Sequence, residues 1–385
     1  MIPLDKNSIY IIDRLAQNGF NAYAVGGAVR DGLLGRAICD IDIATDALPD
    51  EMHSVFEGER LVDTGIRHGT VTLVRDGTPY EITTFRTELG YSDSRHPDAV
   101  SFVKDIVTDL SRRDFTVNAM AYSPSEGLID PFGGRDDLKK GILRTVGEPA
   151  DRFSEDALRI LRCIRFSSVY GFTAEQNTFD ACYALRDTIK SISRERAYAE
   201  LSKILTGDYS ARILEEYYGV ILGLLGEYSV PRTYSQLPKS PAMRFSALCG
   251  SRVGEVLLSL RADKNTCREA SAYAHSRPIP KTLPQIKRFI NEHGVPLAKQ
   301  IAIYRNALFG EDGDGIVSRV ADSGECLSVQ QLDINGSDLQ TLGIKGSDIK
   351  KTLDALLFAV FDGELANSKE LLLKKAKYID NDQKL

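Results

Sequence analysis

The sequence GGAVRD at residues 26–31, followed by DIDIA at residues 40–44, decides how this chain folds. The residues just before it alternate as in a short strand, and paired glycines at a strand end let backbone N–H groups approach a phosphate closely. A helix starting near Ala28 would direct its positive end toward the same place, and Arg30 would add a fixed cation. We therefore predict a triphosphate-binding turn that contains Gly27 and Arg30.

The DIDIA segment has the pattern of a strand whose alternate side chains lie on opposite faces. The two isoleucines would face the core, which places Asp40 and Asp42 together on the other face. Two like charges side by side are unfavourable unless a cation lies between them, and a hard divalent ion with oxygen ligands fits best. Glu81 would supply a third carboxylate if its strand lies beside this one. The pattern predicts a catalytic site at Asp40, Asp42 and Glu81 that uses two Mg²⁺ ions, with Asp40 and Asp42 as metal ligands.

Two other interpretations of these segments are weaker. A DxD pattern is common, and a plain surface strand would explain it without any metal. A dinucleotide-binding turn would explain the glycines, but GGAVRDGLLG lacks the GxGxxG spacing and gives the two aspartates no role. We therefore favour metal-assisted chemistry on a nucleoside triphosphate, in which one ion activates a hydroxyl nucleophile and the other stabilises the leaving pyrophosphate.

Composition limits the class of protein. The chain has 385 residues, enough for two to four domains, and its 43% hydrophobic and 26% charged residues are ordinary for a globular protein. No apolar run reaches the roughly 18 residues of a membrane span, and the start has no secretory signal pattern, which predicts a cytoplasmic protein without a membrane partner. A net charge of −6 argues against nucleic-acid binding over the whole surface, although basic tracts occur at residues 268–305 and 369–377.

The cysteines and histidines do not form a metal-binding pattern. Six cysteines lie far apart without a CxxC pair, which predicts reduced and mostly buried thiols, and the five histidines have no ligand spacing. Any bound metal must therefore be held by carboxylates. No feature of the sequence points to an obligate protein partner.

The secondary-structure pattern changes near residue 147. Strand patterns at 21–25, 40–44, 70–75 and 80–85 alternate with helical ones before it, and helical patterns follow it, including 155–170, 178–185 and 194–205. This predicts an α+β fold class. Turn-forming residues suggest four domains, at 1–147, 148–206, 207–310 and 311–385.

Four further motifs make a family recognisable. They are RRDFTVN at 112–118, DPFGG at 130–134 with Arg144, EDALR at 155–159, and RER at 194–196 with Glu200. With the first two segments they resemble the class II tRNA nucleotidyltransferases, which comprise CCA-adding enzymes and bacterial poly(A) polymerases. The resemblance implies a polymerase-β-like nucleotidyltransferase head followed by all-α neck, body and tail domains. It also implies addition of C, C and A from CTP and ATP to the 3′ end of tRNA, with release of pyrophosphate.

The RRDFTVN motif is predicted to be a helix capped by Ser111. Asp114 and Asn118, four residues apart, would share a helix face and could bind a ribose 2′-hydroxyl, which would favour NTP over dNTP. The resemblance implies the same role for the motif and a nucleotide contact for Arg113. A surface helix with a local ion pair is the alternative.

The EDALR motif is predicted to begin a helix with two distinct faces. An apolar stripe would pack inward, while Asp156, Arg159, Arg162 and Arg165 lie on the other side. Taken alone, these four would be a first-turn acid and a solvated basic face. The resemblance implies that they bind the nucleotide and that Asp156 and Arg159 serve as a protein template for its base. A carboxylate can accept from the amine of cytosine or adenine while a guanidinium donates to the ring acceptor, whereas uracil and guanine present the reverse pattern.

Three regions carry further predictions. The segment at residues 86–100 matches a flexible loop that the family needs for the final A, which favours full CCA addition, and the DPFGG motif resembles the family's hinge. Arg194 and Glu200 would brace the neck.

In the tail, a helix starting at Ser347 could hold a tRNA backbone phosphate together with Lys345, Lys350 and Lys351. A capped surface helix explains the same residues.

Other functions stay open at this point. A poly(A) polymerase, an A-adding enzyme or a CC-adding enzyme would share these motifs, and only the sequence of the product separates them. A catalytically inactive RNA-binding protein is disfavoured because the charged residues of the motifs are intact. A histidine/aspartate phosphohydrolase is disfavoured because no His-Asp pair follows His96.

Overall fold

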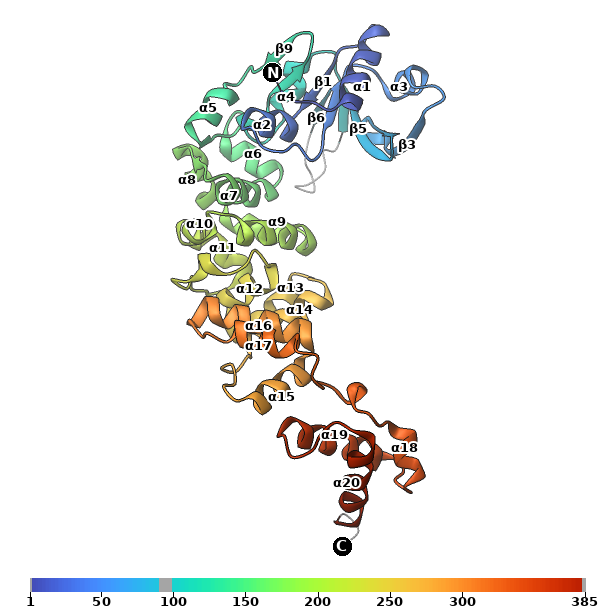
Figure 1. Cartoon of the computed structure of the whole chain (residues 1–385). Coiled ribbons are helices and arrows are strands. Elements are labelled where there is room, and N and C mark those ends of the chain that lie inside the picture. Colours follow the sequence, from blue (N-terminus) through green and yellow to red (C-terminus); the bar gives the residue numbers. More distant parts are fainter. Residues whose placement is uncertain (1, 90–98, 383–385) are drawn as a thin grey trace. The chain divides into compact units, whose positions relative to one another are not determined.

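The computed structural model describes residues 2–89 and 99–382, and the chain divides into two compact units, Met1–Tyr228 and Ser229–Leu385. Within the described residues, every strand belongs to the first unit and the second unit is helical (Figure 1). The prediction of an α+β head followed by helices is therefore confirmed. The middle of the predicted loop at 86–100, residues 90–98, lies outside the described residues.

A mixed sheet of seven strands forms the base of the first unit, in the order β3-β4-β5-β2-β1-β8-β9. The strands are β1 Ala22–Val25, β2 Asp42–Thr45, β3 Arg60–Gly65, β4 Thr70–Arg75, β5 Thr78–Thr84, β8 Ala121–Ser123 and β9 Gly127–Ile129. Neighbouring strands are antiparallel except β2 and β5, which run parallel with Ile43 opposite Ile82. Two small sheets pair β6 Arg86–Leu89 with β7 Ala99–Phe102, and β10 Ile142–Leu143 with β11 Thr173–Ala174.

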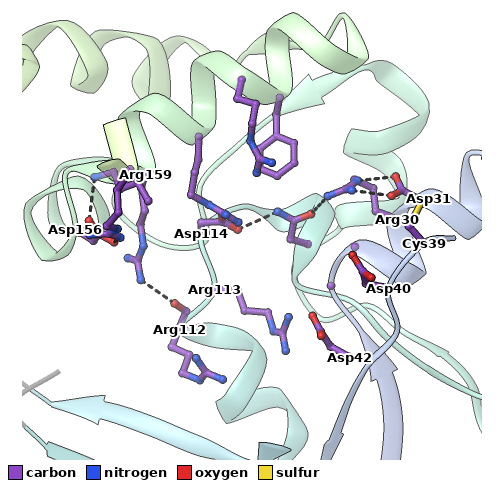
Figure 2. A pocket seen from close by; sticks show the side chains of 18 of the residues that line it. Arg30, Asp31, Cys39, Asp40, Asp42, Arg112, Arg113, Asp114, Asp156 and Arg159 are labelled. Atoms are coloured by element: carbon purple, nitrogen blue, oxygen red, sulfur yellow. Dashed lines mark hydrogen bonds and ion pairs between the residues drawn. The ribbon is translucent and has the colours of Figure 1, made fainter. Parts of the chain in front are cut away.

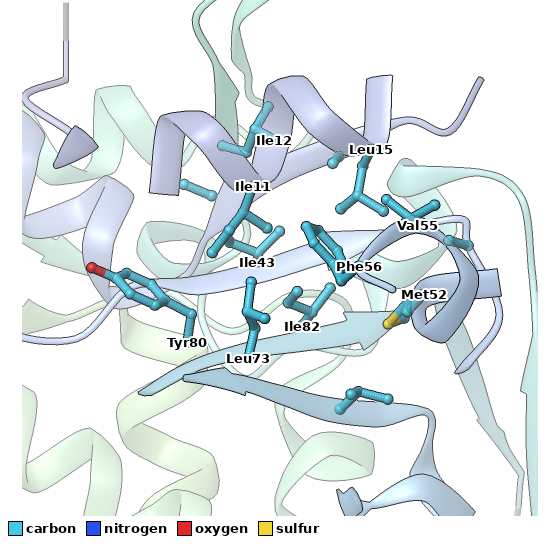
Figure 3. Packing of buried hydrophobic residues seen from close by; sticks show 14 residues of the cluster. Ile11, Ile12, Leu15, Ile43, Met52, Val55, Phe56, Leu73, Tyr80 and Ile82 are labelled. Atoms are coloured by element: carbon cyan, nitrogen blue, oxygen red, sulfur yellow. The ribbon is translucent and has the colours of Figure 1, made fainter. Parts of the chain in front are cut away.

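One face of the large sheet carries the main apolar core of the head (Figure 3). Helices α1 (Lys6–Gln17) and α3 (Pro49–Val55) cover it, and Asp5 caps α1 by accepting a hydrogen bond from the Ser8 N–H at 2.7 Å. Ile43 of β2 is fully buried in this core. Because side chains alternate along a strand, Asp42 points to the opposite face. The core thus orients one predicted metal ligand.

The other face is covered by short helices and leads into the neck. The helices of this part are α2 Gly27–Leu33, α4 Ile106–Ser111, α5 Gly134–Lys140, α6 Pro149–Glu155, α7 Leu158–Tyr170, α8 Gln176–Ala184, α9 Arg194–Thr206, α10 Ser210–Glu216 and α11 Tyr218–Leu225, with 3₁₀ turns η1 Ile66–His68, η2 Thr116–Asn118 and η3 Arg186–Ser191. The predicted apolar stripe of α7 is buried, with Ile160, Leu161 and Ile164 at 0% exposure. This burial fixes which face of α7 remains for a ligand.

Three predicted elements differ in the structure. The strand expected at residues 40–44 begins only at Asp42, so Asp40 lies in the segment before it. The helix expected at 155–170 is two helices, because Asp156 has extended backbone angles (φ −145°, ψ 107°) and its carboxylate accepts from the Leu158 N–H at 2.9 Å. Asp156 therefore caps α7 and is not a first-turn acid of one long helix.

The third difference concerns the RRDFTVN motif. Its predicted helix is wrong: α4 is capped by Asp105 and ends at Ser111. Phe115 then has extended angles and forms a β-bridge to Thr145. Asp114 and Asn118 are consequently not on one helix face, although they remain in contact.

The second unit is helical throughout its described residues. Its helices are α12 Pro241–Cys249, α13 Val253–Ser259, α14 Lys264–Ala274, α15 Leu283–His293, α16 Val295–Phe309, α17 Asp314–Ala321, α18 Gly336–Thr341, α19 Ser347–Phe361 and α20 Lys369–Asp382, with 3₁₀ turns η4 Tyr234–Gln236, η5 Gly250–Arg252 and η6 Val329–Gln331. A separate apolar cluster around Leu339, Leu356 and Leu372 holds the last three helices together. No helix within residues 2–89 or 99–382 is long and apolar enough to cross a membrane.

Candidate active site

A cavity of about 810 Å³ opens in the first unit, between the second face of the sheet and helix α7. It collects the predicted site residues Gly27, Arg30, Asp40, Asp42, Arg113, Asp114, Asn118, Asp156, Arg159, Arg162 and Arg165. Glu81 is the one predicted catalytic residue that does not line it. Eight arginines line the cavity against five aspartates, so a protein with net charge −6 concentrates positive charge here. The cavity is suited to an anionic ligand such as a triphosphate.

The glycine turn forms one wall of this cavity. Gly26 has φ 68° and precedes α2, a backbone conformation that a residue with a side chain rarely adopts. A Cβ atom at Gly26 would lie 2.9 Å from the Arg113 guanidinium. The turn therefore favours glycine at residue 26, and any side chain there would also displace the end of Arg113.

The two carboxylates of the DIDIA segment face the cavity near Arg113 (Figure 2). Burial raises the pKa of Asp42 above its ordinary value, and although Arg113 opposes this, the adjacent charge of Asp40 adds to it. Like charges are thus brought together, as the sequence predicted. Asp40 reaches this position from the segment before β2 rather than from the strand itself.

A third carboxylate does not join this pair. Glu81 lies on β5, one residue before Ile82, which pairs with Ile43 of β2. This register puts Glu81 beside Asp42 on the neighbouring strand, yet outside the cavity lining. Among the residues that the structure describes, no group of three or more His, Cys, Asp or Glu side chains gathers to hold a metal. The role of Glu81 as a catalytic residue stays a prediction.

A bonded chain of side chains crosses the middle of the cavity. Asn118 donates to Asp114 at 3.0 Å, and Asp114 accepts from the Arg162 Nε at 2.6 Å. Burial alone would raise the pKa of Asp114, but Arg162 and Asn118 hold it below its ordinary value. The carboxylate is therefore ionised and fixed in orientation.

Arg30 occupies a different environment from the one the sequence suggested. Its guanidinium is buried and donates to Asn118, Tyr170 and twice to Asp31. It also stacks over the rings of Phe166 and Tyr170, at 5.0 and 4.6 Å from their centroids. Its phosphate contact stays a prediction, whereas its bonds within the protein are evident.

At the far end of the cavity, Asp156 and Arg159 are each held by other residues. Asp156 accepts from Arg196 of α9 at 2.7 Å as well as from the Leu158 N–H. Arg159 forms an ion pair with Glu155 and donates to the backbone carbonyl of Arg112 at 3.3 Å. The two side chains are preorganised by these partners.

Arg162 and Arg165 continue along α7 from this end. Both guanidinium groups lie over the ring of Phe166, and Arg165 pairs with Glu200 of α9 at 2.8 Å. Glu200 thus holds α7 and α9 together, whereas the part of Arg194 in the predicted brace stays a prediction. Burial lowers the pKa of Arg165, and the carboxylate of Glu200 opposes that shift.

Several lining residues were missed by the sequence analysis. Arg112, Phe166 and Arg196 line the cavity, and Tyr170 contacts Arg30 behind it. Arg196 stands within the RER motif, so its presence there was the available signal. Nothing in the local pattern distinguishes Phe166 or Tyr170 from other apolar positions of α7.

The predicted tail site is only partly visible. Helix α19 begins at Ser347 as expected, with Gly346 as its N-terminal cap, and Lys345, Lys350 and Lys351 are exposed. Lys351 pairs with Asp348 at 3.0 Å. The helix start is confirmed, and the RNA contact stays a prediction.

All six cysteines are free, and Cys163, Cys182 and Cys249 are buried. The prediction of reduced thiols therefore fits this structure, whereas the prediction of burial applies to half of them, because Cys39 is exposed and Cys267 and Cys326 are partly buried.

The comparisons with known proteins agree with this geometry. Residues 22–144 match the model of the Poly A polymerase head domain, and residues 171–218 match the region described as "Probable RNA and SrmB- binding site of polymerase A". The fold and the site thus define a nucleotidyltransferase with a polymerase head.

The whole-chain comparisons narrow this class. The chain is 37% identical to the CCA-adding enzyme of Geobacillus thermodenitrificans over 96% of each protein, and 35% identical to that of Ligilactobacillus salivarius over 97% of this chain and 96% of the relative. The structure of the Bacillus stearothermophilus CCA-adding enzyme in complex with CTP superposes with a TM-score of 0.85 at 33% identity, covering 100% of this chain and 99% of the other. The chain belongs to the CCA-adding enzymes.

Proposed function

We propose that the cavity of the first unit adds C, C and A, from CTP and ATP, to the 3′ end of tRNA and releases pyrophosphate. One observation carries this proposal: the Asp40–Asp42 pair and the Asp156–Arg159 pair open into the same cavity. The first pair suits phosphoryl chemistry, and the second suits selection of a base. We infer a cytoplasmic location, because tRNA and nucleoside triphosphates are present there.

The residues at the first pair fit a Mg²⁺ site. Two carboxylates side by side, with the pKa of one raised by burial and by its neighbour, leave a charge that a divalent cation would neutralise. Mg²⁺ typically takes one or two protein carboxylates and completes its shell with water and substrate phosphates, so a third protein ligand is not essential. Mg²⁺ ions held by Asp40 and Asp42 would supply activation of the RNA 3′-hydroxyl and stabilisation of the leaving pyrophosphate.

The middle of the cavity would position the nucleotide. Arg113, which is half-buried and close to the charge of Asp42, would bind the triphosphate. Asp114 and Asn118 would read the ribose, because their fixed orientation presents polar groups at one side of the cavity. The ring of Phe166 lines the cavity on the α7 side and would exclude water there.

Base selection would rest on Asp156 and Arg159. Each is restrained by a partner, so its hydrogen-bonding atoms stay in place without reorganisation when a nucleotide enters. A carboxylate acceptor beside a guanidinium donor matches cytosine and adenine and opposes uracil and guanine. Leaving such groups unpaired costs about 1–3 kcal/mol each.

The second unit would bind the body of the tRNA. We propose that Lys345, Lys350 and Lys351, with the N-terminus of α19, contact its backbone, and that the chain works as a head, neck, body and tail with boundaries near residues 147, 206 and 310. The exposed lysines and the folded α19 support this assignment.

The test is an extension assay. Purified protein is incubated with Mg²⁺, CTP and ATP and a tRNA transcript lacking its last three nucleotides, and the 3′ ends are sequenced. Products that end in CCA are expected. Runs of A alone, a single A added only to tRNA that already ends in CC, or a stop at CC would overturn full CCA addition, and no extension of any RNA would overturn the whole proposal.

A further inference from the structure

Tyr170, the last residue of α7, connects the neck to the glycine turn of the head. Its hydroxyl accepts a hydrogen bond from the Arg30 Nη2 at 2.6 Å and donates one to Asp31 Oδ1 at 3.0 Å. Its ring stacks on Phe172, with centroids 5.3 Å apart, and lies under the guanidinium of Arg30. The ring is therefore packed between aromatic and cationic neighbours, which include the Arg36 guanidinium at 4.5 Å, and its hydroxyl bonds both Arg30 and Asp31. It does not itself line the cavity.

Arg30 transmits this position to Asn118. The Arg30 Nη1 donates to Asn118 Oδ1 at 2.6 Å. An arginine can only donate, so it must meet the amide oxygen. On its other side the Asn118 amide meets Asp114 at 3.0 Å, an ionised carboxylate that can only accept, so Nδ2 must lie there. The two partners together fix which way the amide points.

The fixed amide leaves a specific group for a ligand. Asn118 Nδ2 carries two hydrogens, and the contact with Asp114 uses one of them. Asp114 itself already accepts from the Phe115 N–H, from Asn118 and from Arg162. Of these two side chains, Asn118 is therefore the one with a hydrogen left to donate to a ribose oxygen in the cavity that it lines. A rotated amide would present an oxygen acceptor at that point instead.

We propose that Tyr170 is a positioning residue for ribose selection. Through Arg30 it holds the Asn118 amide in the orientation that donates to the 2′-hydroxyl of the incoming nucleotide. The inference rests on the proposed reading of the ribose by Asp114 and Asn118. Tyr170 lies on α7, and it would act on the ribose only through the side chains of Arg30 and Asn118.

The primary test replaces Tyr170 with phenylalanine in the full-length protein. Tyr170→Phe removes the hydroxyl contacts to Arg30 and Asp31 and keeps the ring that stacks on Phe172. The kcat and KM for CTP and for dCTP are measured with tRNA lacking its CCA end. The preference for CTP over dCTP in kcat/KM should fall about fivefold, the effect of one hydrogen bond, mainly through a higher KM for CTP.

A matched control separates positioning from a general loss of stability. Tyr183→Phe also removes a half-buried hydroxyl contact in the first unit, the bond to the Glu216 carbonyl at 2.7 Å, and Tyr183 does not line the cavity. It should lower the melting temperature without changing the CTP to dCTP preference. Equal changes of preference in both variants would overturn the inference. Asp31→Asn, which weakens the anchor of Arg30 from the other side, offers a second variant with the same expected direction.

Asn118→Ala distinguishes failure of this inference from failure of the proposed ribose site. If Asn118→Ala keeps the full preference for CTP, the ribose site is wrong and the inference falls with it. If Asn118→Ala lowers the preference and Tyr170→Phe does not, only the inference is wrong. In the double variant, Tyr170→Phe should cause no further loss, because its effect passes through Asn118; an additive loss would contradict it.

Discussion

The two ends of the cavity differ in how their charged side chains are paired. At the Asp40–Asp42 end, like charges lie together, and the pKa of Asp42 is raised by burial and by its neighbour. At the Asp156–Arg159 end, each charged group already has a partner of opposite charge in the protein, Arg196 for one and Glu155 for the other. This difference supports the proposal that the Asp40–Asp42 end needs a cation, whereas the Asp156–Arg159 end holds the side chains proposed to select the base in place before any ligand binds.

The largest effect on the rate of nucleotide addition is expected at the Asp40–Asp42 end. Asp42→Asn keeps the size of the side chain but removes the charge that a metal ion needs, so the rate of nucleotide addition should fall at least about a thousandfold. Single-turnover extension of tRNA measures it. Retention of a rate within tenfold of the original would show that Asp42 is not a metal ligand.

At the Asp156–Arg159 end, the partner of Asp156 should matter for the choice of base. Arg196→Ala removes one of the two partners of the Asp156 carboxylate and leaves only the Leu158 N–H, so we expect about a tenfold loss of discrimination between CTP and UTP with a smaller fall in the rate with CTP. Competition between the two nucleotides measures it. Arg212→Ala, which breaks a half-exposed pair with Glu216 on α10, is the control and should leave discrimination unchanged.

Mg²⁺ binding should distinguish the two ends without any reaction. Added Mg²⁺ should raise the melting temperature of the original protein by a few degrees, because the ion binds the folded carboxylate pair and not the unfolded chain. The Asp42→Asn variant should show no such rise, whereas Arg196→Ala should show all of it. A rise of the same size in all three proteins would place the ion elsewhere.

The smallest effect is expected outside the cavity. Replacing Lys350 and Lys351 together with alanine should weaken tRNA binding about threefold at low salt and leave base choice intact, because phosphate contacts carry no base information. The same double change at Lys139 and Lys140, two exposed lysines of α5, controls for net charge. Identical losses in the two double variants would remove the case for the tail site.

The sequence predicted which residues line the cavity better than it predicted their local geometry. The strand pattern of DIDIA holds from Asp42 onward, where Ile43 is locked in the core, but Asp40 lies outside the strand. The apolar stripe of α7 lies wholly after residue 156, so hydrophobic spacing could not reveal the break that lets Asp156 cap the helix.

No local sequence pattern could predict the contacts between distant segments. Arg196 reaches Asp156 from a separate helix, and Tyr170 reaches Arg30 across 140 positions. Such pairs depend on how α7 and α9 pack beside the head. The motif residues could be named in advance because their chemistry is local, whereas their partners required the fold.

We propose that opposite ends of one cavity carry base choice and chemistry. The most direct measurement is the rate of addition from each of the four NTPs, taken separately, by the Asp156→Ala variant on tRNA lacking its CCA end. With this division of roles, we expect UTP and GTP to gain relative to CTP and ATP while the overall rate falls less than in Asp42→Asn. An equal loss for all four nucleotides would contradict it.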